Sequence, residues 1–117
     1  MKLLLRRGQK SGVLSSSVTF TLDVRADLTE QELANIKTYK LGKEELFSRG
    51  EAGDGLIKRL RTHVTLTVDD LVRGKRIDCP DIVEMLDVVQ QIKESCKLFK
   101  RILDASAQFG GEEVIEF

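Results

Sequence analysis

The two cysteines are the side chains of this sequence with the clearest capacity for covalent chemistry. Cys79 directly precedes Pro80, where a long segment of periodic apolar residues begins. A thiol at the N-terminus of a helix can have a lowered pKa, because the helix dipole stabilises the thiolate. Cys79 is therefore the basis of one alternative function, a thiol-dependent enzyme. The simpler interpretation is a small residue packed at a helix start, and Cys96, among apolar neighbours, should be inert core.

Other patterns that would support catalysis or metal binding are incomplete. His63 is the single histidine, and as a general base it would need a nucleophile and an orienting carboxylate nearby. A zinc site needs several ligands at short spacing, which one histidine and two distant cysteines do not supply. The glycine-rich stretch at 50–55 is not followed by Lys-Ser or Lys-Thr, so the phosphate-loop pattern fails. We therefore expect no enzyme activity, no cofactor and no bound metal.

Basic residues suggest a second alternative function, a nucleic-acid-binding accessory protein. Cations recur on one face of the expected C-terminal helix, and others stand near the N-terminus. The residues that we single out for this function are Arg6, Arg7, Lys97 and Arg101. The composition argues against it, because 19 basic residues are matched by 19 acidic ones and leave no net field to attract a polyanion. Five Phe, one Tyr and no Trp also leave few side chains on which bases could stack.

Residues 80–108 form the strongest pattern in the sequence, and they predict one long helix. Apolar side chains recur there at alternating spacings of three and four residues, which places them on one face of a helix. The members of this seam are Ile82, Met85, Val89, Ile92, Cys96, Phe99 and Leu103. At a rise of about 1.5 Å per residue, such a helix is roughly 40 Å long. We expect Asp78 or Cys79 to cap it and Gly110-Gly111 to end it.

The apolar surface of this helix is wider than a single seam. Beside the seam stand Val83, Leu86, Val88, Leu98 and Ile102, so that more than half of the circumference is apolar. The seam should pack mainly on the sheet of its own domain, while the extra width predicts burial on a second side. We therefore expect a non-enzymatic protein-interaction or scaffold protein that associates with itself, as a homodimer, or with another protein. The expected interaction residues are Val88, Ile92, Leu98, Phe99 and Ile102.

The N-terminal third predicts two strands followed by a short helix. Residues 2–7 are a short apolar run, and residues 17–26 alternate strictly between polar and apolar, as in an antiparallel strand with one buried face. Between them, residues 8–17 are rich in Gly and Ser and predict a turn. Thr29 and Glu32 have the spacing of a capping box at a helix start. Gly42 is the expected end of that helix.

The middle of the chain and its end contain the remaining expected elements. Glycines and polar residues at 49–55 indicate an exposed loop, and Gly74 should end one helical turn over residues 69–73. Further strands are expected at residues 46–47, 62–68, 75–78 and 112–117. The last of these, as an edge strand, could join the contact surface of the long helix.

These elements predict a single α+β domain over residues 1–117. We expect a small antiparallel sheet of four to five strands, with a short helix and the long C-terminal helix packed on one face. The apolar run after Met1 is interrupted by Arg6 and Arg7, too early for a signal peptide, and no stretch is long enough to span a membrane. Two cysteines too far apart to bridge fit a reducing compartment. The expected location is therefore cytoplasmic, with no membrane contact.

Overall fold

The computed structural model describes residues 1–11, 18–49, 64–109, 112 and 114–117. Within these residues the chain has an α+β fold in which five strands form two antiparallel sheets. The first sheet has the order β1-β2-β5, from β1 (Lys2–Ser11), β2 (Val18–Asp27) and β5 (Lys75–Cys79). The second pairs β3 (Glu45–Arg49) with β4 (Val64–Thr67). The helices are α1 (Glu30–Thr38), α2 (Val68–Arg73) and α3 (Ile82–Ser106).

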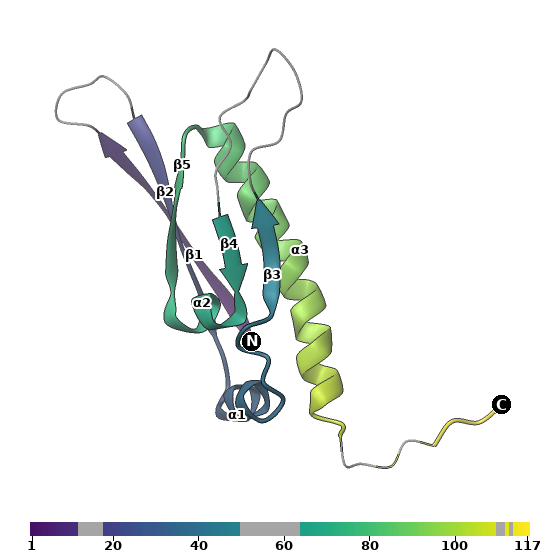
Figure 1. Cartoon of the computed structure of the whole chain (residues 1–117). Coiled ribbons are helices and arrows are strands. Elements are labelled where there is room, and N and C mark those ends of the chain that lie inside the picture. Colours follow the sequence, from purple (N-terminus) through teal and green to yellow (C-terminus); the bar gives the residue numbers. More distant parts are fainter. Residues whose placement is uncertain (12–17, 50–63, 110–111, 113) are drawn as a thin grey trace.

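The two sheets and α3 enclose the larger of two hydrophobic clusters. Alternate residues of β2 and β4, among them Leu22 and Leu66, are fully buried, because each strand turns one face inward. They join the apolar residues of α3 from Met85 to Cys96 in one buried cluster. Further along α3, Phe99 and Leu103 form a second cluster with Ile36 of α1 and Val68 of α2. The short helix α2 turns the chain from β4 to β5, and Lys75 Nζ donates a hydrogen bond to the Thr65 carbonyl oxygen at 2.8 Å between these strands. In Figure 1, α3 runs beside the paired strands, with β3 next to it.

Several predictions of local structure are confirmed. The α+β class, the number of strands and the continuous C-terminal helix are as expected, although the strands are divided between two sheets. Thr29 caps α1: its Oγ1 accepts a hydrogen bond from the Glu32 amide at 3.1 Å, while Glu32 Oε1 accepts one from the Thr29 amide at 3.0 Å. Gly74 ends α2 with a φ of 93°, a conformation that glycine adopts without a steric penalty.

The predicted ends of three elements were wrong. Strand β1 continues through residues 8–11, expected to be a turn, because they pair with residues 18–21 of β2. Helix α1 ends at Thr38 rather than near Gly42, since Lys40 takes the left-handed conformation with a φ of 54°. The cap of α3 is Asp81, whose Oδ1 accepts a hydrogen bond from the Glu84 amide at 2.7 Å. Pro80 therefore precedes the cap instead of opening the helix.

The C-terminal end also differs from the prediction. Helix α3 ends at Ser106, with Ala107 as its C-cap, several residues before the glycine pair that was expected to end it. The predicted strand at 112–117 is wrong for residues 112 and 114–117, which form no strand. The predicted loop at 49–55 and the first residues of the predicted strand at 62–68 lie largely outside the described residues.

Gly42 has a structural role other than the predicted one. Its carbonyl oxygen accepts a hydrogen bond from the Asp69 amide at 2.9 Å, and a Cβ at Gly42 would clash with the Asp69 carboxylate. The close approach of the loop before β3 to the start of α2 therefore requires a residue without a side chain.

Candidate functional site

The seam of α3 is part of the core of the chain itself. Val88, Ile92 and Phe99 are at most 2% exposed, so these three of the five expected interaction residues are covered within one copy. Val88 and Ile92 are buried in the cluster that includes residues of both sheets, whereas Phe99 is buried with Ile36 of α1 and Val68 of α2. The surface of α3 that can meet a partner is therefore limited to its two flanks.

The first flank of α3 forms a groove with the segment that leads into β3. Leu98 and Ile102 are 58% and 45% exposed, in agreement with their expected position beside the seam. The groove has a volume of about 280 Å³, and we call it the β3-side groove. Its lining consists of Leu41, Glu44, Glu45, Leu46, Ser95, Leu98, Phe99 and Ile102. Large exposed apolar side chains in a concave site are typical of a surface that another molecule covers.

The second flank of α3 forms a wider groove with the start of β1. This β1-side groove has a volume of about 520 Å³ and is lined by Met1, Leu3, Lys93, Cys96, Lys97, Lys100 and Arg101. Its floor is apolar and its rim is cationic. The sequence predicted that the four cations share a helix face, but it did not indicate that β1 supplies the opposite wall. The alternation of Leu3 and Leu5 within the first strand was the signal that could have done so.

A buried carboxylate stands at the end of the β1-side groove. Glu32 is 8% exposed. Its Oε1 lies 3.0 Å from the Met1 amino group, and its Oε2 lies 3.6 Å from Lys100 Nζ. Burial by itself raises the pKa of Glu32, but hydrogen bonds from Thr29 and the contact with the Met1 amino group outweigh it and hold the pKa below its ordinary value of 4.5. The carboxylate thus stays charged and joins α1, β1 and α3.

The four residues singled out for nucleic-acid binding do not form one patch. Lys97 and Arg101 line the β1-side groove, whereas Arg6 lines a hollow of about 690 Å³ on the outer face of the first sheet. Arg7, the next residue of β1, has its side chain on the opposite face of that strand. The sequence could not show this division, because it depends on which face of β1 turns toward α3.

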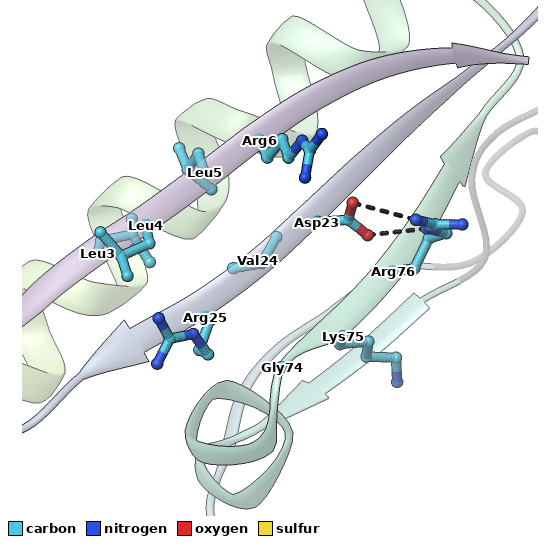
Figure 2. Close-up of a pocket in the computed structure, with 10 residues that line it drawn as sticks. All are labelled: Leu3, Leu4, Leu5, Arg6, Asp23, Val24, Arg25, Gly74, Lys75 and Arg76. Carbon is cyan, nitrogen blue, oxygen red and sulfur yellow. Dashed lines mark hydrogen bonds and ion pairs between the residues drawn. The ribbon is translucent and has the colours of Figure 1, made fainter.

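The hollow on the outer face contains charges of both signs. Arg76 Nε lies 2.8 Å from Asp23 Oδ1, and Arg76 Nη2 lies 3.3 Å from Oδ2, as Figure 2 shows. The hydrogen bonds from Arg76, with a smaller contribution from the charge of Arg6, lower the pKa of Asp23. Leu4 and Arg25 lie beside them on the same face. The row from Arg6 through Asp23 to Arg76 is therefore a cross-strand ion pair on a solvated face, worth little to stability.

Neither thiol has the surroundings of a nucleophile. Cys79 is fully buried at the end of β5, two residues before the cap of α3. Cys96 lies in the seam, where burial raises its pKa to about 11. The thiolate is the reactive form of cysteine, and a buried thiol is also closed to substrates. The geometry therefore gives no support to a thiol-dependent enzyme at Cys79.

Further chemistry is not apparent in the part of the chain that the structure describes. Across residues 1–11, 18–49, 64–109, 112 and 114–117, no three side chains of His, Cys, Asp or Glu are grouped to hold a metal ion. Asp70 completes the capping box of α2, because its Oδ2 accepts a hydrogen bond from the amide of the N-cap residue Thr67 at 3.0 Å. His63 lies outside the described residues. Among the described helices, none combines the length and the apolar content that crossing a bilayer requires.

Comparison with known proteins does not add a family to these observations. No family model matches the chain, and no curated protein or solved structure is significantly similar to it. The argument for function therefore depends on the two grooves that flank α3.

Proposed function

We propose that this chain is a non-enzymatic interaction protein that forms a homodimer through the β3-side groove. The single observation that supports the proposal is the exposure of Leu98 and Ile102 beside a groove with an apolar floor. Covering an apolar side chain of this size is worth roughly 1.5–3 kcal/mol. A surface with two such side chains in its centre and charged residues at its rim has the anatomy of a protein interface.

A second copy is the partner that the geometry favours. When two α3 helices cross antiparallel at Leu98, each inserts Leu98 and Ile102 toward the groove of the other, which is the self-complementary contact of a two-fold dimer. The small side chain of Ser95 lines the groove on the same flank and leaves room for the crossing.

The test is the mass of the chain in solution. Light scattering during size-exclusion chromatography at tens of micromolar should give the mass of a dimer for the wild type. Leu98→Glu with Ile102→Glu should give a monomer, because each subunit would then bring two carboxylates into the apolar contact. Retention of the α-helical circular dichroism signal would show that both copies stay folded.

A matched control uses exposed apolar residues near the start of the same helix, which do not line the β3-side groove. Val83 and Leu86 are as exposed as Leu98, at 72% and 56%. The variant Val83→Glu with Leu86→Glu should therefore remain a dimer. A monomeric wild type at this concentration would contradict the proposal, and so would an unchanged mass of the Leu98→Glu/Ile102→Glu variant.

The two alternative functions have less support. Nucleic-acid binding retains two of its four expected residues in one groove, and a mobility shift with DNA or RNA at low salt would revive it. The thiol-dependent enzyme has no exposed thiol in the described residues. The expected cytoplasmic location stays a prediction.

A further inference from the structure

The inference concerns the edge of β1 that β2 does not use. Among the described residues, β1 pairs with β2 alone, so its other edge is open along a strand of ten residues. The β1-side groove lies at the start of this edge, where Met1 and Leu3 line it, with α3 as its far wall. An open edge presents unpaired backbone donors and acceptors to which a further strand can add. Cations on both sides of the edge favour an acidic strand over a basic one.

We propose that residues 112–117 of a second copy add to this edge as an antiparallel strand. The segment has the sequence Glu-Glu-Val-Ile-Glu-Phe, whose β-branched and aromatic residues favour a strand. Val114, Ile115 and Phe117 are more than 60% exposed and form no strand within their own copy. The segment therefore has apolar side chains to bury and acidic side chains to pair.

In one antiparallel register, the side chains of the segment match those on the outer face of β1 in charge and apolar character. In this register, every described residue of the segment on that face lies opposite a residue of opposite charge or of matching apolar character. The facing pairs are Glu112 with Arg6, Val114 with Leu4, and Glu116 with Lys2. Opposite charges and apolar pairs that face each other across strands each contribute about 0.2–1 kcal/mol.

The same register directs two apolar side chains toward the β1-side groove, while Glu113 lies opposite Leu5, which does not line the groove. The residues that alternate with the outer set point to the other face, toward α3. Ile115 then lies opposite Leu3, and Phe117 lies opposite Met1, both of which line the groove. The two apolar side chains of the segment would cover the floor, including Cys96, under the aliphatic stems of the lysines. A slip by one residue would send these side chains to the wrong faces.

The direction of the chain shows why the strand comes from a second copy. Lys100, near the end of α3, and the Met1 amino group both contact Glu32, so α3 ends where β1 begins. The segment that follows α3 within one copy would therefore run in the same direction as β1. Such parallel pairing is less stable per residue than antiparallel pairing, and every strand pair of the described residues is antiparallel.

The two-fold dimer brings the second copy's segment to the correct end of the edge. With α3 helices crossing at Leu98, the partner helix runs toward the start of α3 and ends about 12 Å beyond the crossing point, at about 1.5 Å per residue. Five residues, 107–111, span up to about 17 Å when extended, which is enough to cross the exposed face of α3. The segment then enters near Arg6 and runs toward Met1. The proposal rests on the proposed function in this respect, but it uses the opposite flank of α3.

A disulfide trap tests the pairing and its register. Full-length chains that carry Leu4→Cys or Val114→Cys are mixed under mild oxidation, one of them with a mass tag. Directly opposed side chains of antiparallel strands are close enough to bridge. The control pairs Leu4→Cys with Ile115→Cys, because the side chain of residue 115 points to the other face of the sheet. The mixed disulfide between residues 4 and 114 should form at least ten times faster than the disulfide in this control. Equal rates would overturn the proposal, and so would a link within one chain when both substitutions are combined at low concentration.

A charge exchange provides the second test. Lys2→Glu with Arg6→Glu, and Glu112→Lys with Glu116→Lys, should each slow the 4–114 link at least tenfold when present in both chains. Mixing a chain of the first kind with one of the second should restore the rate to within about threefold, since every pair is again of opposite sign. Lys10→Glu with Lys43→Glu, outside the register, is the matched control and should leave the rate unchanged. Failure of the mixed pair to recover would refute the pairing.

The outcomes separate this proposal from the homodimer interface. If only the β3-side contact is wrong, Leu98→Glu/Ile102→Glu leaves the mass unchanged while the 4–114 link still forms. If only the strand addition is wrong, that variant becomes monomeric and the wild-type dimer shows no preferential 4–114 link.

Discussion

The seam of α3 and its flank at the β3-side groove both carry large apolar residues, and these differ in what covers them. Ile92 is fully buried against both sheets, whereas Leu98, six residues further along the same helix, is 58% exposed. The two flanks also differ from each other, because one groove has an apolar floor with glutamates at its rim and the other has a cationic rim. The comparison teaches that apolar character alone does not tell a core residue from an interface residue.

Replacing a seam residue should have the largest effect on stability. Ile92→Ala should lower the free energy of unfolding by about 3 kcal/mol, because it removes fully buried methyl and methylene groups and leaves a cavity. Urea denaturation followed by circular dichroism measures the change. A loss below about 1 kcal/mol would mean that the seam is not packed as the structure shows.

Removing the charge of Glu32, at the end of the β1-side groove, should have the second largest effect on stability. Glu32→Gln should cost about 2 kcal/mol near neutral pH, since the carboxylate accepts hydrogen bonds and faces Lys100 and the Met1 amino group. The folded-state pKa of Glu32 lies below its ordinary value of 4.5, so this stabilisation is complete above about pH 4.5 and is lost as the pH falls through the folded-state pKa. Urea midpoints of wild type and variant should therefore converge in acid. A difference that is independent of pH would contradict the assigned role.

Salt should distinguish the two grooves. Raising sodium chloride from about 50 to about 500 mM should slow the 4–114 disulfide link several-fold, because the strand addition depends on ion pairs that salt screens. The same change should alter the dissociation constant of the β3-side contact less than about twofold, if measured on the Glu112→Lys/Glu116→Lys variant by analytical ultracentrifugation. Similar salt dependence of the two would mean that the grooves do not differ as described.

Truncating the flank should have the smallest effect on the folded subunit. Leu98→Ala should change the free energy of unfolding by less than about 0.5 kcal/mol at sub-micromolar concentration, where dimers dissociate. At tens of micromolar it should lower the apparent stability further than that, because dimer formation stabilises the folded state by mass action. Equal effects at both concentrations would place Leu98 in the core instead.

The local structure was largely accessible from the residues, and the site only in part. The capping box at Thr29, the glycine at the end of α2 and the alternation of β2 depend on neighbours within a few residues, so spacing alone predicted them. The extension of β1 was decided by its pairing with β2. The cap of α3 was decided by the Asp81 carboxylate, which accepts a hydrogen bond from the Glu84 amide. Of the expected interaction residues, two lie on the surface and three in the core.

By itself, the sequence determined that one long helix with an apolar face lies within residues 80–108 and that cations gather on another face, because both properties follow from helical periodicity. Only the tertiary structure decided that the two sheets cover Val88 and Ile92, that the short helices cover Phe99, that Leu98 borders an apolar groove, and that β1 stands opposite Lys97. The reason is physical: periodicity specifies which side chains share a face, but coverage depends on contacts between segments far apart in the chain, which local spacing does not encode.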